Sequence, residues 1–235
     1  GHEIAGVVVE KGPDLETDWM DLPIAVGSKI MIPPFMPCGE CYYCKHYPEH
    51  SNRCQTPVYY GRYLGFDKAP HLWGGWAEYV YVDLEMLPGT KIYKLPDDLP
   101  LRLGALAEPL TSPIGILAIA AAREMGAGRV ICVGAPEEPR LALARRFGAE
   151  ATVNIEELTT PAERIARVRE IAGGFGADLV MDCTGHPTAG PEGIEFLRDS
   201  GFYIEMGQFT DAGAIETNWH RFVAKDITIM GSWAF

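Results

Sequence analysis

Four cysteines crowd into one short stretch of the chain, and they constrain its fold more than any other feature. Cys38, Cys41, Cys44 and Cys54 follow the pattern C-x2-C-x2-C-x9-C, whereas the other two cysteines stand alone in apolar runs. Tetrahedral zinc takes four thiolates at about 2.3 Å, and such a site can hold together a loop that has no apolar core. The spacing indicates metal rather than disulfides, because free surface thiols at this density would oxidise.

A zinc ribbon that binds nucleic acid is the main alternative for this pattern. Such a ribbon needs a basic surface, and Glu40, Lys45 and Glu49 beside the cysteines do not supply one. The chain has 32 acidic against 20 basic residues and a formal net charge of −12, which also argues against a phosphate-backbone partner. At 47% hydrophobic and 22% charged residues the composition is typical of a soluble globular protein, without an apolar run of membrane-spanning length. We therefore expect no nucleic acid, no membrane partner and a cytoplasmic location.

The chain changes its pattern near residue 112. Residues 1–112 are rich in glycine, proline, valine and aromatics, which predicts irregular β structure. In residues 113–235, helical segments alternate with short apolar runs that have a glycine at or just past their ends, and this predicts an α/β unit with a parallel sheet. The strand-like runs lie at 4–10, 29–32 and 77–82 in the first part, and at 129–134, 177–183, 202–207 and 227–231 in the second.

Two helices have readable starts. Ser112 and Pro113 can begin a helix that ends before Gly126. Thr160 and Glu163 form a capping box, followed by apolar residues on one helical face. These apolar residues are Ile165, Val168 and Ile171.

The cysteine pattern resembles the structural-zinc lobe of zinc-dependent medium-chain alcohol dehydrogenases. The opening Gly1-His2-Glu3-Ile4-Ala5-Gly6 is similar to the G-H-E zinc motif of that family. The segment Ala107-Glu108-Pro109-Leu110 resembles the place where its sorbitol-, threonine- and glucose-dehydrogenase-like branch sets a glutamate facing the metal. The resemblance implies a GroES-like irregular β catalytic domain over residues 1–112. It also implies a Rossmann-type doubly wound parallel-sheet cofactor domain over residues 113–235.

The resemblance also implies two zinc sites. Structural zinc would be held by the four cysteines, and catalytic zinc by His2, Glu3 and Glu108, with either glutamate bound directly or lying beside the metal. Considered alone, His2 and Glu3 could instead be an ordinary polar pair. Glu108 could instead be a surface carboxylate at the end of a helix. The loop before the last cysteine is two residues longer than in the family, so His46 or His50 could compete as a ligand.

The cofactor segment is incomplete relative to this family. Of its G-x-G-P-I-G turn only Pro113-Ile114-Gly115 is present, with no room upstream for a first strand. We expect the protein to have a further segment between Ser112 and Pro113, and residues before Gly1, including a cysteine ligand, and after Phe235. The cofactor contacts implied by the resemblance are Pro113, Ile114, Gly115, Gly134, Arg140, Cys183, Thr184, Gly185, Met206, Gly207 and Gln208.

NAD is favoured over NADP as the cofactor. A 2′-phosphate calls for nearby arginine or lysine, yet Glu137 and Glu138 are nearer to the strand end at Gly134 than Arg140 is. Two strand-end turns, Cys183-Thr184-Gly185 and Met206-Gly207-Gln208, could bind the cofactor or could simply end their strands. The location favours function, because ligands bind at the carboxyl ends of parallel strands.

The implied activity is hydride transfer between a secondary, cyclic or polyol alcohol and NAD(P). A metal-free quinone or enone reductase of the same fold and a non-catalytic relative are the alternatives. Aromatic residues between Tyr59 and Trp76, together with Phe35, could line a wall for a bulky apolar alcohol, or form local core. We expect cyclic or aryl alcohols to be better substrates than sugar-like polyols. The family also implies a homodimer or homotetramer.

Overall fold

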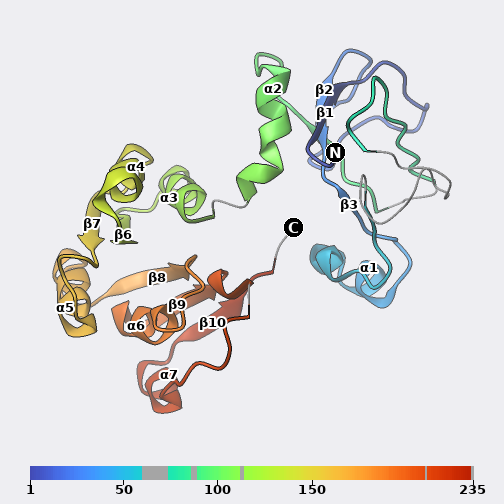
Figure 1. The fold of residues 1–235 in the computed structure, drawn as a ribbon. Coiled ribbons are helices and arrows are strands. Elements are labelled where there is room, and N and C mark those ends of the chain that lie inside the picture. Colours follow the sequence, from blue (N-terminus) through green and yellow to red (C-terminus); the bar gives the residue numbers. More distant parts are fainter. Residues whose placement is uncertain (60–73, 86–88, 112–113, 210, 234–235) are drawn as a thin grey trace. The chain divides into compact units, whose positions relative to one another are not determined.

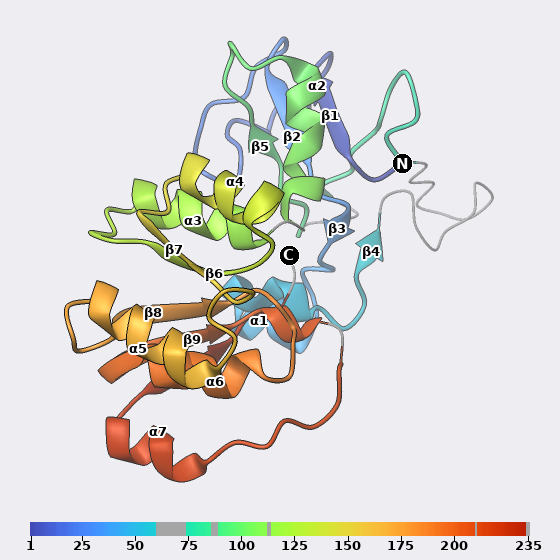
Figure 2. The same cartoon turned by 60° about the vertical axis from the view of Figure 1, so that its left-hand side comes forward.

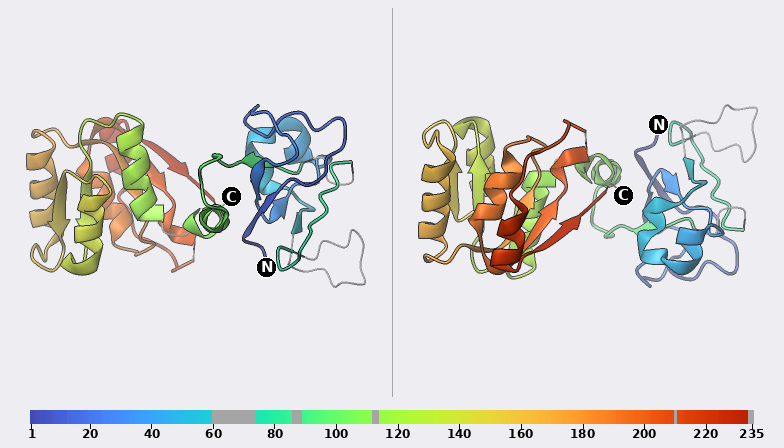
Figure 3. Two further views of the ribbon diagram at one scale, coloured as in Figure 1. Left: turned by 90° about the horizontal axis from the view of Figure 1, so that it is seen from above. Right: turned by 90° about the horizontal axis from the view of Figure 1, so that it is seen from below.

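The computed structural model describes residues 1–59, 74–85, 89–111, 114–209 and 211–233 (Figure 1). The chain divides into two compact units, Gly1–Ser112 and Pro113–Ala234. In the views of Figure 3 the blue-to-cyan part of the first unit consists mainly of loops and short elements, whereas the second unit, yellow-green to red, has helices packed against strands. Among the described residues, no helix is both long and apolar enough to cross a bilayer.

In the first unit, a small antiparallel sheet carries an apolar core. Its strands β1 (Ile4–Val7), β2 (Lys29–Ile32) and β5 (Tyr93–Lys94) lie in the order β1-β2-β5, and β3 (Phe35–Met36) pairs with β4 (Val58–Tyr59) in a second, two-stranded sheet. Ile4 lies opposite Ile32 in the register, and both pack with the fully buried Met36. The core therefore fixes the start of the chain, which carries His2, beside the strand that leads to the cysteines.

The prediction of a strand at 77–82 is wrong. Its alternation is visible in the burial, since Val80 and Val82 pack on apolar clusters while Tyr79 and Tyr81 are exposed. The segment nevertheless pairs with no strand of the described chain and has no regular structure. A period of two reports that one face is buried, but it does not supply a neighbouring strand to accept the backbone hydrogen bonds. The first expected strand, 4–10, is also shorter than predicted and ends at Val7.

The helices of the first unit are short. They are α1 (Tyr42–His46), α2 (Leu101–Gly104) and the 3-10 turns η1 (Pro48–Arg53), η2 (Ala105–Ala107) and η3 (Pro109–Thr111). The loop before Cys54, two residues longer than expected, is accommodated by η1. The helices α1 and η1 carry the cysteine cluster, and the turns η2 and η3 flank Glu108.

In the second unit the strands run parallel but form two sheets within the described residues. β6 (Ile131–Gly134) pairs with β7 (Ala151–Asn154), and β8 (Ala177–Asp182), β9 (Leu197–Glu205) and β10 (Thr228–Gly231) form a sheet in the order β10-β9-β8. All four expected runs form strands here, whereas β7, which contains Thr152 and Asn154, lacks the apolar run that would have identified it. Val133 of β6 and Val180 of β8 pack on the same apolar cluster. The two sheets therefore share a core.

Helices cover the strands of this unit. They are α3 (Ile114–Glu124), α4 (Ala142–Arg146), α5 (Pro161–Ile171), α6 (Ala189–Phe196) and α7 (Trp219–Lys225), with a π turn η4 (Glu137–Leu141) and a 3-10 turn η5 (Gly207–Phe209). α6 packs against β8 and β9, and α5 packs beside α6 (Figure 2). The expected capping box of α5 is confirmed, because Thr160 accepts a hydrogen bond from the Glu163 N–H and Glu163 accepts one from the Thr160 N–H. Ser112 and Pro113 lie outside the described residues.

A buried lysine links α7 to the rest of this unit. Lys225 Nζ donates hydrogen bonds to the carbonyl oxygens of Ile194, at 2.8 Å, and Leu197, at 2.6 Å. These carbonyls lie at the C-terminal end of α6, where the partial charge of the helix is negative and favours a cation. Burial lowers the pKa of Lys225.

The capping box at Thr160 generates a prediction about stability. Thr160→Ala should lower the free energy of unfolding of the second unit by about 1 kcal/mol, because the N–H of Glu163 loses its acceptor. Urea unfolding of the protein measures this change. The matched control, Thr159→Ala, changes the neighbouring threonine, which does not cap the helix, and should stay within about 0.5 kcal/mol of the parent. Equal losses in both variants would contradict the assignment.

Candidate zinc and cofactor sites

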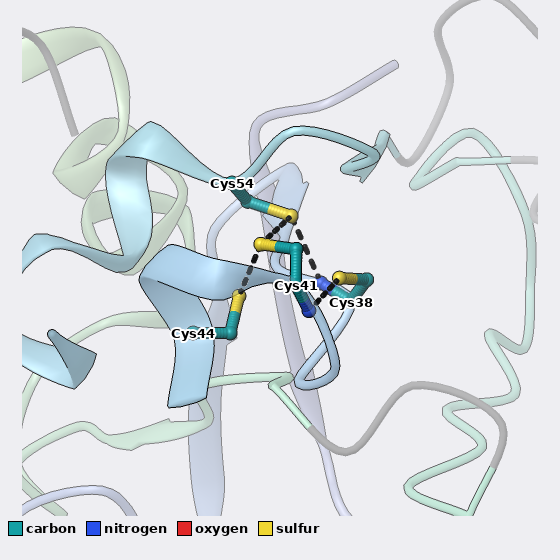
Figure 4. Close-up of side chains that lie close together, drawn as sticks. All are labelled: Cys38, Cys41, Cys44 and Cys54. Carbon is teal, nitrogen blue, oxygen red and sulfur yellow. Dashed lines mark hydrogen bonds between the residues drawn. The ribbon is translucent and has the colours of Figure 1, made fainter. Parts of the chain in front are cut away.

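The structure brings the four predicted cysteines together. Cys38 follows β3, Cys41 is the N-cap of α1, Cys44 lies within α1, and Cys54 ends η1. Their sulfur atoms all lie within 4.8 Å of one another, with Cys41 Sγ 3.5 Å from Cys44 Sγ and 3.9 Å from Cys54 Sγ (Figure 4). Four ligands at about 2.3 Å in a tetrahedron place sulfur atoms about 3.8 Å apart. The donor set therefore fits a single zinc ion.

The backbone around this cluster already directs N–H groups at sulfur. Cys38 Sγ accepts hydrogen bonds from the N–H groups of Glu40, at 3.4 Å, and Cys41, at 3.3 Å, while Cys54 Sγ accepts one from the Cys38 N–H at 3.2 Å. Gly39 has a φ of +75°, a conformation that glycine adopts without strain and that the tight turn between Cys38 and Cys41 requires. These N–H donors stabilise negative charge on the two sulfur atoms.

The pKa values of the thiols are spread apart by this environment. Burial is the largest influence on Cys38 and raises its pKa, but hydrogen bonds from Thr56 and from the backbone N–H groups of Glu40 and Cys41 outweigh it and lower the pKa to about 6. Burial raises the pKa of Cys44 and of Cys54. A metal that takes all four sulfurs as thiolates would therefore release protons, which makes metal affinity fall as the pH falls.

Histidine takes no part in this cluster. Within the described chain the only group of three or more metal-binding side chains is the set of four cysteines. His46 ends α1, and the ring of Tyr42 lies 5.0 Å from its imidazole, centroid to centroid. His50 lies in η1 and is exposed.

His2 and Glu108 approach each other although 105 residues separate them in the chain. His2 Nε2 lies 3.9 Å from Glu108 Oε1, and the carboxylate is the better shielded of the two, with 14% of the side chain exposed against 41% for His2. Zinc–nitrogen and zinc–oxygen distances of about 2.0–2.2 Å allow one ion to bridge donors up to about 4 Å apart. The pair thus fits two ligands of one metal.

Glu3 is placed differently. Its side chain is exposed, and in the part of the chain that the structure describes no set of three donors within 4.8 Å includes it. The structure therefore brings together two of the three predicted catalytic ligands. A role for Glu3 stays a prediction.

A cavity of about 440 Å³ adjoins Glu108 in the first unit. Its apolar wall contains Phe35, which the sequence had indicated, and three prolines that flank it. The strand β5 and its neighbours contribute alternate residues, Lys91, Tyr93 and Leu95, which sequence reasoning missed although their period of two was a usable signal. The remaining lining residues are Met31, Pro33, Pro34, Pro37, Ser51, Asn52 and Ala107.

The aromatic wall expected between Tyr59 and Trp76 falls largely outside the described residues, because 60–73 are not described. Tyr59 contacts Phe35 edge to face, with ring centroids 5.3 Å apart. Trp76 is 93% exposed. Of the aromatics that the sequence had indicated, Phe35 lines the cavity beside Glu108, and Tyr59 contacts its ring.

In the second unit, the predicted turns after β8 and β9 meet. A Cβ atom added to Gly185 would lie 2.2 Å from the carbonyl oxygen of Gly207, and one added to Gly207 would lie 2.3 Å from the Gly185 nitrogen. No other residue type fits at either position. The N–H of Met206 donates to the Asp182 carbonyl at 3.0 Å. Cys183 lies near α3, because a Cβ atom added to Gly115 would be 3.6 Å from the Cβ of Cys183. The structure therefore gathers most of the predicted cofactor residues.

One atom at these turns lacks a partner. The side-chain nitrogen Nε2 of Gln208 is buried and has no hydrogen-bond acceptor in the described chain. A buried amide without an acceptor is costly, and a polar ligand at the strand ends would satisfy it. This orphaned donor fits a nucleotide cofactor at the position predicted for one.

For Gly134 and Arg140, two further predicted cofactor residues, the described contacts are with other parts of the unit than the turns after β8 and β9. Gly134 ends β6, and a Cβ added there would meet Leu141 at 3.8 Å. Arg140 is exposed and donates a long hydrogen bond, 3.4 Å, to the carbonyl of Ala135. Ile114 begins α3, while Pro113 lies outside the described residues.

Two family models match the chain, and together they cover both units. The alcohol dehydrogenase GroES-like domain matches residues 1–97, and the zinc-binding dehydrogenase domain matches residues 113–235. Among curated proteins, the erythritol/L-threitol dehydrogenase of Mycolicibacterium smegmatis is 34% identical over 232 residues, which cover 89% of this chain and 58% of that protein. The L-threonine 3-dehydrogenase of Pyrococcus furiosus is 30% identical over 253 residues, covering 98% and 65%.

The chain thus spans less than two thirds of the length of these curated relatives. The alignment with the Pyrococcus protein is longer than this 235-residue chain, so part of the relative's sequence inside the matched region has no counterpart here. This agrees with the expected further segment.

Solved structures match the fold. An alcohol dehydrogenase from Thermotoga maritima has a TM-score of 0.81 at 29% identity, covering 98% of this chain and 68% of that one. A zinc-binding dehydrogenase from Sinorhizobium meliloti bound to NADP has a TM-score of 0.72 at 24% identity, covering 99% and 68%. The expected fold class, a GroES-like unit followed by a Rossmann-type α/β unit, is confirmed.

The cysteine cluster generates a prediction about metal content. Cys41→Ser should abolish zinc binding at the cluster, because a serine hydroxyl is a poor substitute for a thiolate that lies between two other sulfurs. Zinc per chain, measured by elemental analysis after dialysis, should fall relative to the parent. The control Cys132→Ala removes a cysteine of β6 and should leave the zinc content unchanged. Unchanged zinc in Cys41→Ser would rule out the cluster as a metal site.

Proposed function

Because the chain belongs to the zinc-dependent medium-chain alcohol dehydrogenase family, we propose that it transfers hydride between an alcohol and a nicotinamide dinucleotide, giving a ketone or aldehyde. The single observation that carries this proposal is the approach of His2 to Glu108 beside a cavity in the first unit. The fold brings these two residues from distant parts of the chain to within 3.9 Å of each other. A histidine and a carboxylate with an adjoining cavity are the donors that a catalytic zinc requires.

The proposed division of roles follows from the two zinc sites. The four cysteines are a closed site, which suits a structural ion, whereas His2 and Glu108 leave positions open for substrate. Zinc bound at the open site supplies Lewis-acid chemistry, lowering the pKa of an alcohol hydroxyl as it lowers the pKa of bound water to about 7. Glu108, with 14% of its side chain exposed, would offer a carboxylate oxygen to this ion beside the cavity, and His2 would offer its Nε2 nitrogen. Glu3 is proposed to lie beside the metal rather than on it.

The chain's own residues shape where the alcohol sits. Phe35 and the prolines beside it form an apolar wall of the cavity next to Glu108, so an alcohol that fills the cavity would displace water from that side of the carboxylate. Lys91 and Tyr93 add polar groups to the lining. Exclusion of water strengthens every electrostatic interaction in the site.

We propose NAD rather than NADP as the cofactor. After β6, Glu137 forms an ion pair with Arg145, and Arg145 also donates to Thr152 Oγ1 at 2.6 Å. A 2′-phosphate near this strand end would have to compete with Glu137 for the arginine, whereas the 2′-hydroxyl of NAD would not. Arg140 is oriented towards the backbone of Ala135.

The alternatives predict different behaviour. A metal-free quinone or enone reductase would need neither the cysteine cluster nor the His2–Glu108 pair, and a non-catalytic relative would show no turnover. No feature of the described residues favours either one. The homodimer or homotetramer stays a prediction from the family.

Activity of the intact protein tests the proposal. Alcohol-dependent formation of reduced nicotinamide, followed by its absorbance, should occur with NAD at higher kcat/KM than with NADP. Glu108→Gln should lower kcat/KM by about 10- to 100-fold, because an amide is a weaker zinc donor than a carboxylate. The control Glu10→Gln changes an exposed carboxylate of the same unit and should be silent. Full activity of Glu108→Gln, or quinone reduction without alcohol oxidation, would contradict the proposal.

The apolar wall generates a prediction about substrate class. Cyclic or aryl alcohols should give higher kcat/KM than sugar-like polyols, because burying a ring against Phe35 and the prolines contributes about 25 cal/mol per Å² of apolar surface. A panel of alcohols matched in carbon number measures the difference. A polyol that turns over best would contradict this preference.

A further inference from the structure

Two acidic residues end neighbouring strands of the second unit and lie around one tyrosine. Asp182 is the last residue of β8, Glu205 is the last residue of β9, and the two are partners in the strand register. Tyr203, two residues before Glu205, has only 3% of its surface exposed, and Asp182 has 5%. In the described chain neither carboxylate forms an ion pair with a lysine, arginine or histidine at 4.0 Å or less.

The tyrosine hydroxyl bridges the two carboxylates. Tyr203 Oη lies 3.2 Å from Asp182 Oδ2 and 3.5 Å from Glu205 Oε2. A phenol has one proton, so it can donate to only one of them at a time, and both oxygens depend on the same donor. Burial and the negative charges of Asp182 and Glu205 raise the pKa of Tyr203, so the hydroxyl keeps its proton.

The other oxygen of each carboxylate holds one of the predicted cofactor turns. Asp182 Oδ1 accepts the Thr184 N–H at 2.7 Å and the Thr184 hydroxyl at 2.8 Å. Glu205 Oε1 accepts the Gln208 N–H at 3.0 Å. Each carboxylate therefore has one oxygen on a turn and the other on Tyr203.

The tyrosine ring is fixed from the helix side as well. A Cβ added to Gly193 of α6 would lie 2.8 Å from Tyr203 Cε2, so the absence of a side chain at Gly193 makes room for the ring. The hydroxyl is thus held in place by packing that does not involve the turns. The Tyr203 hydroxyl therefore offers the two carboxylates a donor whose position is set by the packing of the ring.

From this arrangement we propose that Asp182, Tyr203 and Glu205 are positioning residues for the cofactor, with the Tyr203 hydroxyl fixing the two turns, Thr184-Gly185 and Gly207-Gln208, relative to each other. The proposal rests on the proposed function, because it takes these turns as the cofactor site. Without the hydroxyl, the buried carboxylate of Asp182 and the half-buried carboxylate of Glu205 would face each other with no donor between them. Their repulsion and the loss of their hydrogen bond would move the turns that they hold.

The test uses Tyr203→Phe in the intact protein, which keeps the ring against Gly193 and removes only the hydroxyl. Hydrogen exchange of the cofactor-free protein should be faster at the Thr184 and Gln208 amides. The Kd for NAD, measured by fluorescence titration, should rise about tenfold, which corresponds to about 1.4 kcal/mol. Turnover at saturating NAD should stay within about twofold, because the groups that touch the alcohol are unchanged.

The matched control is Asp178→Asn, at the opposite end of the same strand. Asp178 is exposed and pairs with Arg198 at 2.7 Å, so its loss removes an ion pair of β8 without touching the turns. Neither exchange at the turns nor the Kd should change. If Tyr203→Phe does not fold, Glu205→Gln keeps the shape and removes the charged acceptor, and it should raise both quantities in the same direction by about threefold.

The outcomes separate this inference from the proposed function. Unchanged exchange at both turns, or faster exchange with an unchanged Kd for NAD, would overturn the positioning role even in an active enzyme. A parent protein that binds neither NAD nor NADP would refute the proposed function and the cofactor part of this inference. In that case, exchange would still show whether the hydroxyl orders the turns.

Discussion

The segment from Cys38 to Cys54 depends on the approach of four sulfur atoms, because it has no other interior. α1 buries no residue, and η1 buries only Ser51. The rings of Tyr42, Tyr43 and Tyr47 contact one another on the surface, which cannot replace a core. Ser51 and Asn52 of this segment also line the cavity beside Glu108. An ion that fixes the cysteines therefore also fixes one wall of the cavity in which the proposed chemistry takes place.

The second unit depends instead on where its parallel strands end. Parallel strands bring their carboxyl ends to one edge of the sheet, so the residues that follow each strand lie close together there although they are far apart in sequence. The close approach of Gly185 to Gly207 shows how tightly the turns are packed at this edge. In the described chain β6 and β8 each lack a strand on one side while sharing an apolar cluster. Unpaired strand edges are unfavourable in a folded protein, which agrees with a further segment between Ser112 and Pro113.

Features with local causes were predictable from the sequence, and those with distant causes were not. The convergence of the four cysteines and the Thr160 capping box involve residues within one loop or one helical turn, and the structure shows both, while zinc at the cysteines stays a prediction. The segment 77–82 shows the limit, because alternation at Val80 and Val82 could not say whether a neighbouring strand was present. The bridge from Tyr203 to Asp182 needs the register of β8 on β9 and the space left by Gly193, and neither can be read from one strand alone.

The two predicted catalytic carboxylates differ for a reason of chain geometry. Successive side chains of an extended segment point to opposite sides. Ile4 is buried, His2 is half-buried, and Glu3 between them is exposed, so exposure alternates over these three residues at the start of the chain. His2 approaches Glu108, whereas the neighbouring Glu3 is exposed to solvent. Glu108 has no such restriction, because it lies between two short 3-10 turns and approaches the histidine from another part of the fold.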